Sequence, residues 1–254
     1  MNGFRTGHAM LDEAPQLDSG RGHASRALDS KTNLLLSSST ATGSAVSPNA
    51  LVLNEQGHVK DPKVVLAIRP KIERGPMSKV VGIIVHQTGG SNGKGALSSY
   101  EKDNANGAHF LIDKDGTIYQ TASVYKRCNH VGQLKSRCMA EQRCTPAELK
   151  ALAGKGPGKG IGRVESEKAW PNRYPGNFDA IGIEIVGTTK PATSEQRKKW
   201  QEEFVYEELT DEQQASFSWL LRKLLATLQV QMTEVFTHPT VSWKNRSEGG
   251  GAKW

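Results

Sequence analysis

Short apolar runs separated by polar breaks divide the chain after about residue 75 into strand-like elements. The run at 80–86, VVGIIVH, is rich in β-branched residues, which predicts a buried strand that ends at His86. The runs at 109–113 and 117–121, HFLID and TIYQT, flank a Lys-Asp-Gly turn. Because an Asp-Gly pair between apolar runs suits the backbone of a tight turn, these two runs predict a β-hairpin.

The C-terminal part adds another strand and a long helix. In IGIEIVG, at 181–187, alternation puts the isoleucines on one face and Glu184 on the other. Thr210 and Gln213 form a capping box, which predicts the start of a helix. The apolar residues that follow recur at helical spacing and form one core-facing stripe: Phe217, Leu220, Leu221, Leu224, Leu225 and Leu228. A shorter helix is expected within 195–208. The mixture predicts an α/β (α+β) domain with a central mixed β-sheet flanked by helices.

Two segments lack this periodicity. Residues 1–74 include stretches such as SSSTATGSAVSPNA, which cannot bury enough apolar surface to offset the entropy of ordering. We expect a flexible low-complexity arm there, followed by one domain at 75–254. Within the domain, residues 132–178 contain GKGPGKGIG and predict a long surface insertion.

Composition and charge exclude some classes of protein. No apolar run approaches the roughly 18 residues of a membrane span, so stable membrane insertion is not expected. The formal net charge of +7 would attract nucleic acid, an anionic membrane surface or an acidic cell-wall polymer alike. Because the basic residues are scattered and form no helix-turn-helix or zinc-finger pattern, we do not expect nucleic acid to be the partner.

The termini and cysteines bear on the compartment. The N-terminus, MNGFRTGHAMLDEAPQ, has no apolar stretch behind a basic start, so we expect no signal peptide and synthesis in the cytoplasm. The cysteines are Cys128, Cys138 and Cys144, and their odd number argues against a complete disulfide framework. A single bridge between Cys138 and Cys144 stays open for an oxidising compartment.

Several residues are candidates for chemistry. His86 and His238 each follow an apolar segment, and Glu248 lies in the polar tail. A hydrolytic zinc site needs three such protein ligands and an open position. Each residue taken alone also has an ordinary structural explanation, as a hydrogen-bonded histidine or a solvated glutamate. Glu184 sits in an apolar strand, where burying a carboxylate is costly without a partner or a purpose. It is a candidate general base, unless its sheet face is exposed to solvent.

The order of motifs carries more information than any one of them. Along the chain stand IIVHQT, AHFLIDKDGTIYQ, NHVG, AIGIEIVG and THP. This order resembles the N-acetylmuramoyl-L-alanine amidase type 2 family, which includes phage lysozyme-like amidases, cell-wall recycling amidases and peptidoglycan recognition proteins. The resemblance covers about residues 78–250. It implies the peptidoglycan recognition protein-like amidase fold and hydrolysis of the amide bond between N-acetylmuramic acid and L-alanine in peptidoglycan.

The resemblance also implies a Zn²⁺ site. His86 matches the family's first zinc ligand and His238 matches the second. The family's third ligand is a Cys or Asp about ten residues later, where this chain has Glu248. Glutamate is an accepted zinc ligand, although this side chain departs from the family pattern. His130 is the substitute ligand if Glu248 does not bind the metal.

Catalytic roles follow from the same resemblance. Glu184 matches the glutamate that recycling amidases use to activate water. A lysine two residues before the third ligand often stabilises the oxyanion in the family, and Arg246 holds that place here, with Lys244 two residues earlier. Other members have a tyrosine before the hairpin histidine, but this chain has Ala108, which favours Glu184 as the base.

Further residues are assigned to the substrate. We expect His130 and Thr88 to contact peptidoglycan, and His109 to pack within the hairpin. The insertion at 132–178 is expected to form one wall of the groove and to set the preference for the stem peptide.

The biological role leaves alternatives. Some relatives only bind peptidoglycan, and others recycle cell wall in the cytoplasm or act as endolysins. The N-terminal arm and the SWKNRSE tail favour an antibacterial effector exported by a type VI secretion apparatus, which acts in the periplasm. Such an effector would need a cognate immunity protein in its producer.

Overall fold

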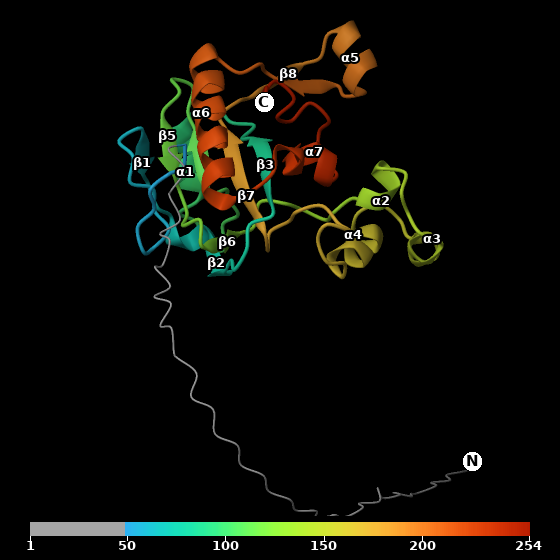
Figure 1. Cartoon of the computed structure of the whole chain (residues 1–254). Coiled ribbons are helices and arrows are strands. Elements are labelled where there is room, and N and C mark those ends of the chain that lie inside the picture. Colours follow the sequence, from blue (N-terminus) through green and yellow to red (C-terminus); the bar gives the residue numbers. More distant parts are fainter. Residues whose placement is uncertain (1–48) are drawn as a thin grey trace, which may run out of the picture. The chain divides into compact units, whose positions relative to one another are not determined.

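The computed structural model describes residues 49–254, which build a mixed sheet with helices on both faces (Figure 1). The sheet has the strand order β1-β5-β4-β7-β3-β10. Its strands are β1 (Val64–Leu66), β3 (Gly82–Gln87), β4 (Phe110–Ile112), β5 (Ile118–Gln120), β7 (Ala180–Ile185) and β10 (Val235–Thr237). The hairpin pair β4 and β5 is antiparallel, whereas the other neighbours are parallel. The predicted strands and hairpin are confirmed, and so is the mixed sheet.

One face of the sheet is covered by α6 (Asp211–Leu228), which begins with the predicted capping box of Thr210 and Gln213. The helix buries the predicted stripe against the isoleucines of β7, and Phe217 and Leu220 are fully buried there. Its last two leucines are only partly buried, yet they pack against the same core. Apolar side chains fill this face of the sheet, which leaves the other face for polar candidate residues.

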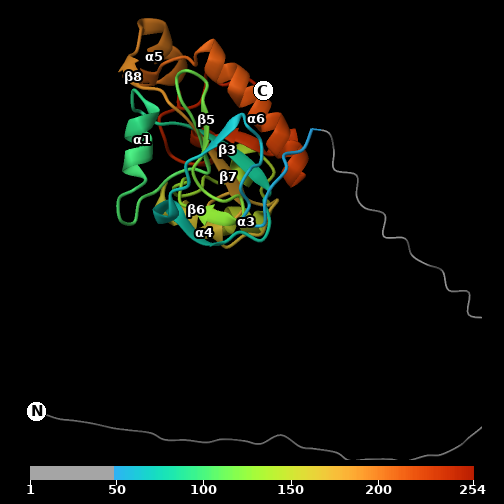
Figure 2. The same ribbon diagram turned by 90° about the vertical axis from the view of Figure 1, so that its left-hand side faces the viewer.

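The other face carries α1 (Gly93–Ser99), and Figure 2 shows α1 and α6 on opposite sides of the sheet. A smaller core lies on the α1 side, formed by Ile84, Val131, Leu134, Tyr174, Ala180 and Val241. Because strand residues alternate, Glu184 faces away from the isoleucines and onto this second face.

Residues 49–74 belong to the folded domain, so the predicted arm boundary at residue 74 is wrong for this part. Leu51, Val59 and Val64 are buried in the main core, and β1 forms an edge of the sheet. The 3-10 helix η1 (Pro70–Ile72) leads into β2 (Glu73–Pro76), which pairs with β6 (Lys126–Cys128). These elements are too short to show a period in the sequence. Strand β1 pairs with β5 at the edge of the central sheet, whereas β2 lies in a separate two-stranded sheet with β6. The rest of the predicted arm, residues 1–48, lies outside the described residues.

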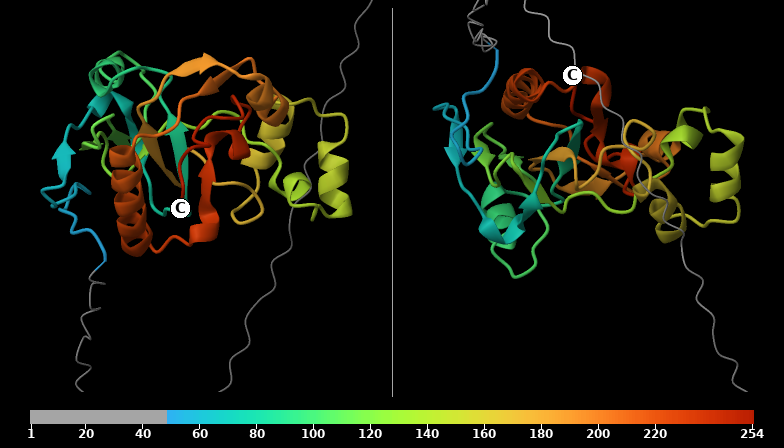
Figure 3. Two further views of the ribbon diagram at one scale, coloured as in Figure 1. Left: turned by 90° about the horizontal axis from the view of Figure 1, so that it is seen from above. Right: turned by 60° about the horizontal axis from the view of Figure 1, so that its bottom comes forward.

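The insertion at 132–178 contains three short helices: α2 (Arg137–Ala140), α3 (Pro146–Leu152) and α4 (Lys159–Ser166). Figure 3 shows them grouped beside the sheet. Cys138, within α2, forms a disulfide with Cys144, which lies two residues before α3. The bridge that the sequence left open is therefore present, and Cys128 is a buried free thiol.

The remaining elements surround the C-terminal tail. A two-stranded excursion consists of β8 (Thr189–Pro191), α5 (Ser194–Trp200) and β9 (Phe204–Tyr206). After α6 come η2 (Met232–Glu234), β10 and the short helix α7 (His238–Val241). Within residues 49–254, no helix combines the length and apolar character that crossing a membrane requires.

Candidate active site

Two candidate residues are neighbours on the sheet. His86 lies near the end of β3 and Glu184 near the end of β7, and the parallel register pairs them directly. Paired residues of adjacent strands point to the same face, so both side chains lie on the face of α1. Parallel strands bring their carboxyl ends to one edge, which places His86 and Glu184 where the sheet opens into loops.

His238 and Glu248 complete a cluster with His86. Strand β10 pairs with β3, so His238, the first residue of α7, arrives beside His86. The Nδ1 atoms of the two histidines lie 2.9 Å apart. Glu248 Oε1 lies 2.8 Å from Nδ1 of His238 and 3.5 Å from Nδ1 of His86. All three side chains are buried.

The geometry of this cluster fits zinc. Ligand atoms at about 2.0–2.1 Å from a tetrahedral zinc ion lie roughly 3.3 Å from one another. The observed separations of 2.8, 2.9 and 3.5 Å are close to that value. Two nitrogens and one oxygen also form the donor set of many hydrolytic zinc sites, which leave a fourth position open.

The protonation states of the cluster also suit a metal. Burial lowers the pKa of His86 to about 4, so its imidazole is neutral at pH 7. Burial would raise the pKa of Glu248, but its hydrogen bonds with His238 and His86 lower that pKa to about 2. A neutral imidazole and an ionised carboxylate are the forms that bind zinc.

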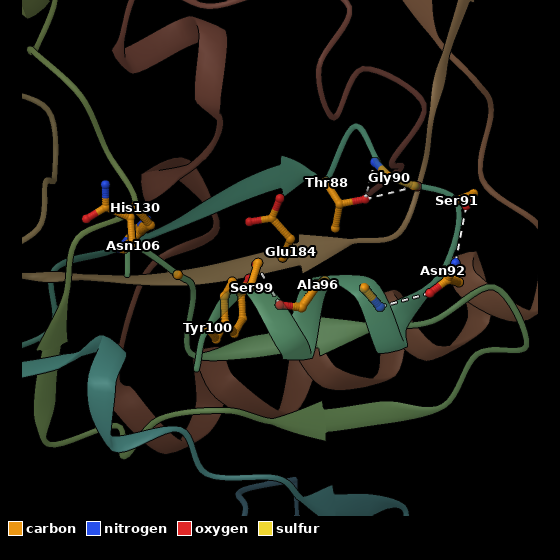
Figure 4. Close-up of a pocket in the computed structure, with 12 residues that line it drawn as sticks. Thr88, Gly90, Ser91, Asn92, Ala96, Ser99, Tyr100, Asn106, His130 and Glu184 are labelled. Carbon is orange, nitrogen blue, oxygen red and sulfur yellow. Dashed lines mark hydrogen bonds between the residues drawn. The ribbon is translucent and has the colours of Figure 1, made fainter. Parts of the chain in front are cut away.

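Glu184 faces a cavity of about 500 Å³ between β7 and α1 (Figure 4). Within residues 49–254 its carboxylate makes no hydrogen bond, so it can contact a ligand in the cavity. Burial and the charge of Glu248 raise its pKa to about 8, while Lys244 opposes this shift. Thr88, His130 and Tyr100 line the same cavity.

His130 contacts His86 but is not part of the cluster that His86 forms with His238 and Glu248. Its Nδ1 lies 3.0 Å from Nε2 of His86, the nitrogen that faces away from His238. Gly182 makes this position accessible, because a Cβ atom there would come within 2.8 Å of the His130 ring. His130 thus orients His86 and also reaches the cavity.

The two predicted cations differ in position. Lys244 is close enough to lower the pKa values of both His86 and Glu184. Arg246 instead donates to Oε1 of Gln201 at 2.6 Å, on the α5 excursion. The structure therefore brings Lys244 to the cluster and directs Arg246 elsewhere.

Thr88 and His109 have clear local roles. Thr88 Oγ1 accepts hydrogen bonds from the backbone of Gly90 and Gly187, and the residue also lines the cavity. His109 is fully buried, with Nε2 donating to the Lys126 carbonyl at 2.8 Å and Nδ1 accepting from Gly182 N–H. His109 is thus a structural residue behind the hairpin.

Sequence reasoning missed Tyr100, which closes α1 and lines the cavity. Burial and the charge of Glu184 raise its pKa well above the usual value, so it stays a protonated hydroxyl. It belongs to none of the motifs that carry the resemblance, and only the packing of α1 on the sheet reveals it.

A family model matches the chain, and several solved structures are similar to it. The family model described as N-acetylmuramoyl-L-alanine amidase matches residues 76–251. A mutant endolysin from Bacillus subtilis is similar in structure, with 18% identity, a TM-score of 0.39, and coverage of 74% of this chain and 84% of the endolysin. The endolysin N-acetylmuramoyl-L-alanine amidase LysCS from Clostridium intestinale has 19% identity, a TM-score of 0.40, and coverage of 74% and 87%.

A selenomethionine derivative of AmpD has 15% identity, a TM-score of 0.43, and coverage of 76% of this chain and 89% of AmpD. No curated protein matches this chain in sequence. The family match covers the central sheet except its edge strand β1, and it includes the His-His-Glu cluster and the residues around the Glu184 cavity. The chain belongs to the N-acetylmuramoyl-L-alanine amidase family.

Proposed function

We propose that the protein is a zinc-dependent hydrolase that cuts the amide bond between N-acetylmuramic acid and L-alanine in peptidoglycan. One observation carries the proposal: His86, His238 and Glu248 converge with three buried ligand atoms beside the cavity that Glu184 faces. Family membership supplies the substrate class.

His86 and His238 would hold zinc through Nδ1, and Glu248 through Oε1. When bound, zinc would polarise the scissile carbonyl and lower the pKa of the attacking water. The remaining steps belong to the side chains around the cavity.

Glu184 is suited to move the proton. Its carboxylate has no competing hydrogen bond in the described chain, and burial raises its pKa to about 8, which makes its ionised form a stronger base than a free carboxylate. We assign it the removal of a proton from the attacking water and delivery of that proton to the departing amine of L-alanine. A nearby metal cation would lower its pKa and favour the ionised form that accepts the proton.

Lys244 is assigned to the oxyanion that develops on the carbonyl. Its electrostatic effect on His86 and Glu184 supports this assignment, because the oxyanion would form between these residues. Thr88 and His130, on the cavity wall, are assigned to substrate binding. The insertion at 132–178 would extend this wall toward the stem peptide.

We further propose delivery into the periplasm as an antibacterial effector, with a cognate immunity protein in the producer. The disulfide between Cys138 and Cys144 supports action in an oxidising compartment. Directing the chain to the periplasm of a test bacterium should be toxic, whereas the same chain kept in the cytoplasm should not. Equal growth in both cases would reject the effector role.

The enzymatic proposal is tested by mass analysis of products from defined muropeptides. Wild-type protein should release a stem peptide with a free L-alanine amine, and Glu184→Ala should release none at the same protein concentration. Cleavage at another bond, or equal cleavage by both proteins, would overturn the assignment.

A further inference from the structure

Helix α2, the first helix of the insertion, is bound by hydrogen bonds to the segment that leads to His238. Arg137, at the start of α2, donates two hydrogen bonds to Glu234, from Nη2 to Oε1 at 2.8 Å and from Nη1 to Oε2 at 3.0 Å. Arg137 is 8% exposed and Glu234 is 7% exposed, so this ion pair is buried. Glu234 immediately precedes β10, whose next residue after the strand is His238.

A second set of contacts holds the chain just after His238. Lys135 Nζ donates to the carbonyl of Pro239 at 2.6 Å, and Lys135 N–H donates to the carbonyl of Val241 at 2.8 Å. Ser242 Oγ donates to the carbonyl of Gln133 at 2.8 Å. Residues 133–137 therefore form hydrogen bonds with the segment 234–242 both before and after His238.

The Arg137 and Glu234 pair is fixed from several directions. Trp170 Nε1 donates to Oε2 of Glu234 at 3.1 Å, which gives that oxygen a second partner. The guanidinium of Arg137 also donates from Nε to Glu141 at 2.7 Å and lies 5.6 Å from the ring centroid of Phe236, within β10. Because a planar guanidinium binds a carboxylate in one orientation, these contacts define where Glu234 lies.

We infer that Arg137 is a positioning residue for the metal site: through Glu234 and β10 it fixes the place of His238 relative to His86. The insertion then helps to build the metal site, in addition to forming a wall beside it. This inference rests on the proposed zinc site. Residues that orient metal ligands from outside commonly change metal affinity by 10–100-fold when they are replaced.

Arg173 offers a matched control in the same insertion. It also forms a two-point ion pair, with Asp179 at 3.2 and 2.7 Å, and both side chains are 14% exposed. Its other side-chain bonds reach the carbonyls of Lys168 and Tyr174, and none reaches the segment 234–242. If the insertion needs such pairs only for stability, Arg137→Met and Arg173→Met should affect zinc binding alike.

The experiment measures the zinc Kd of the full chain by competition with a chelator, alongside urea unfolding of the metal-free protein. We expect Arg137→Met to raise Kd about tenfold or more, Arg137→Lys to give an intermediate value, and Arg173→Met to change Kd less than about twofold. Equal Kd values for Arg137→Met and wild type, or equal losses in the two methionine variants, would overturn the inference.

If Arg137→Met does not fold, a more conservative substitution in the same ion pair tests the inference. Glu234→Gln keeps the size of the side chain and weakens the same pair, so it should raise the zinc Kd while the protein stays folded. An unchanged Kd in folded Glu234→Gln would overturn the inference. Absence of zinc binding by the wild type would overturn the proposed metal site itself, which separates the two failures.

Discussion

Glu184 is the direct register partner of His86 in the parallel pair of β7 and β3. This pairing fixes a carboxylate beside a candidate metal ligand with backbone hydrogen bonds rather than with a flexible loop. The two side chains have different surroundings, which suits His86 to metal binding and Glu184 to proton transfer. Nδ1 of His86 lies in the buried cluster, while Glu184 faces the cavity. Proton transfer and metal binding can therefore be tested separately.

Replacing the proton-transfer group should leave the metal site intact. We expect Glu184→Gln to lower kcat by about 10²–10⁴-fold, because a neutral amide cannot accept a proton from water. The zinc Kd should match that of the wild type, since Glu184 is not among the clustered ligand atoms. Steady-state rates on a muropeptide and a zinc titration check both statements. A variant that loses zinc together with activity would contradict the division of roles.

Glu248 is the ligand that departs from the family pattern, and its removal should affect the metal first. Glu248→Ala leaves two histidines, so we expect the zinc Kd to rise more than about 100-fold. Glu248→Asp should recover part of the affinity, because it keeps the carboxylate on a shorter arm. Glu167→Ala, an exposed position far along the insertion, serves as the control. Zinc binding that survives in Glu248→Ala would point to another ligand, with His130 as the first candidate.

The raised pKa of Glu184 predicts a pH effect on stability. Folding raises this pKa from 4.5 to about 8, so the folded chain keeps a proton that the unfolded chain releases. The stabilisation is fully present below about pH 4.5 and is lost as the pH rises through about 8. Without metal, wild type should lose stability relative to Glu184→Gln between pH 5 and pH 8. Urea unfolding at both values checks this, and a constant difference would contradict the assigned shift.

Gly182 should tolerate no side chain, because a Cβ atom would meet the ring of His130 at 2.8 Å and Ala108 at 3.0 Å. We expect Gly182→Ala to push His130 away from His86 and to lower activity about tenfold or more. Gly160→Ala, in α4, is the control, since its added Cβ would meet nothing closer than 3.5 Å. Equal activities of the two variants would show that the contact between His130 and His86 is dispensable.

Much of the central sheet could be predicted from local sequence. The hairpin, the strand that carries Glu184 and the capped helix α6 each have a strong period or a specific turn. Residues 49–74 were not predicted as part of the domain because their strands have only three or four residues and bury few side chains. The helices of the insertion have only four to eight residues, and α4 begins within a glycine-rich stretch, so the sequence of this segment suggested an irregular surface insertion.

The sequence predicted which residues form the candidate site, but it did not predict how these residues contact one another. His86 lies 152 positions before His238 in the sequence, and the pairing of β10 with β3 brings these two histidines together beside Glu248. Sequence left Lys244 and Arg246 as equal candidates, whereas their side chains take different directions in space. The bonds of Arg137 to Glu234 had no motif, because residues 97 positions apart meet only in the folded chain.

The central claim is that zinc held by His86, His238 and Glu248 is required to cut the amide bond between N-acetylmuramic acid and L-alanine in peptidoglycan. The most direct measurement is release of stem peptide from purified cell wall by one preparation, before metal removal, after removal, and after zinc is returned. We predict that release stops without metal and resumes as zinc binding approaches one ion per chain. Undiminished release from metal-free protein, or zinc-loaded protein that binds the wall without releasing stem peptide, would contradict the account.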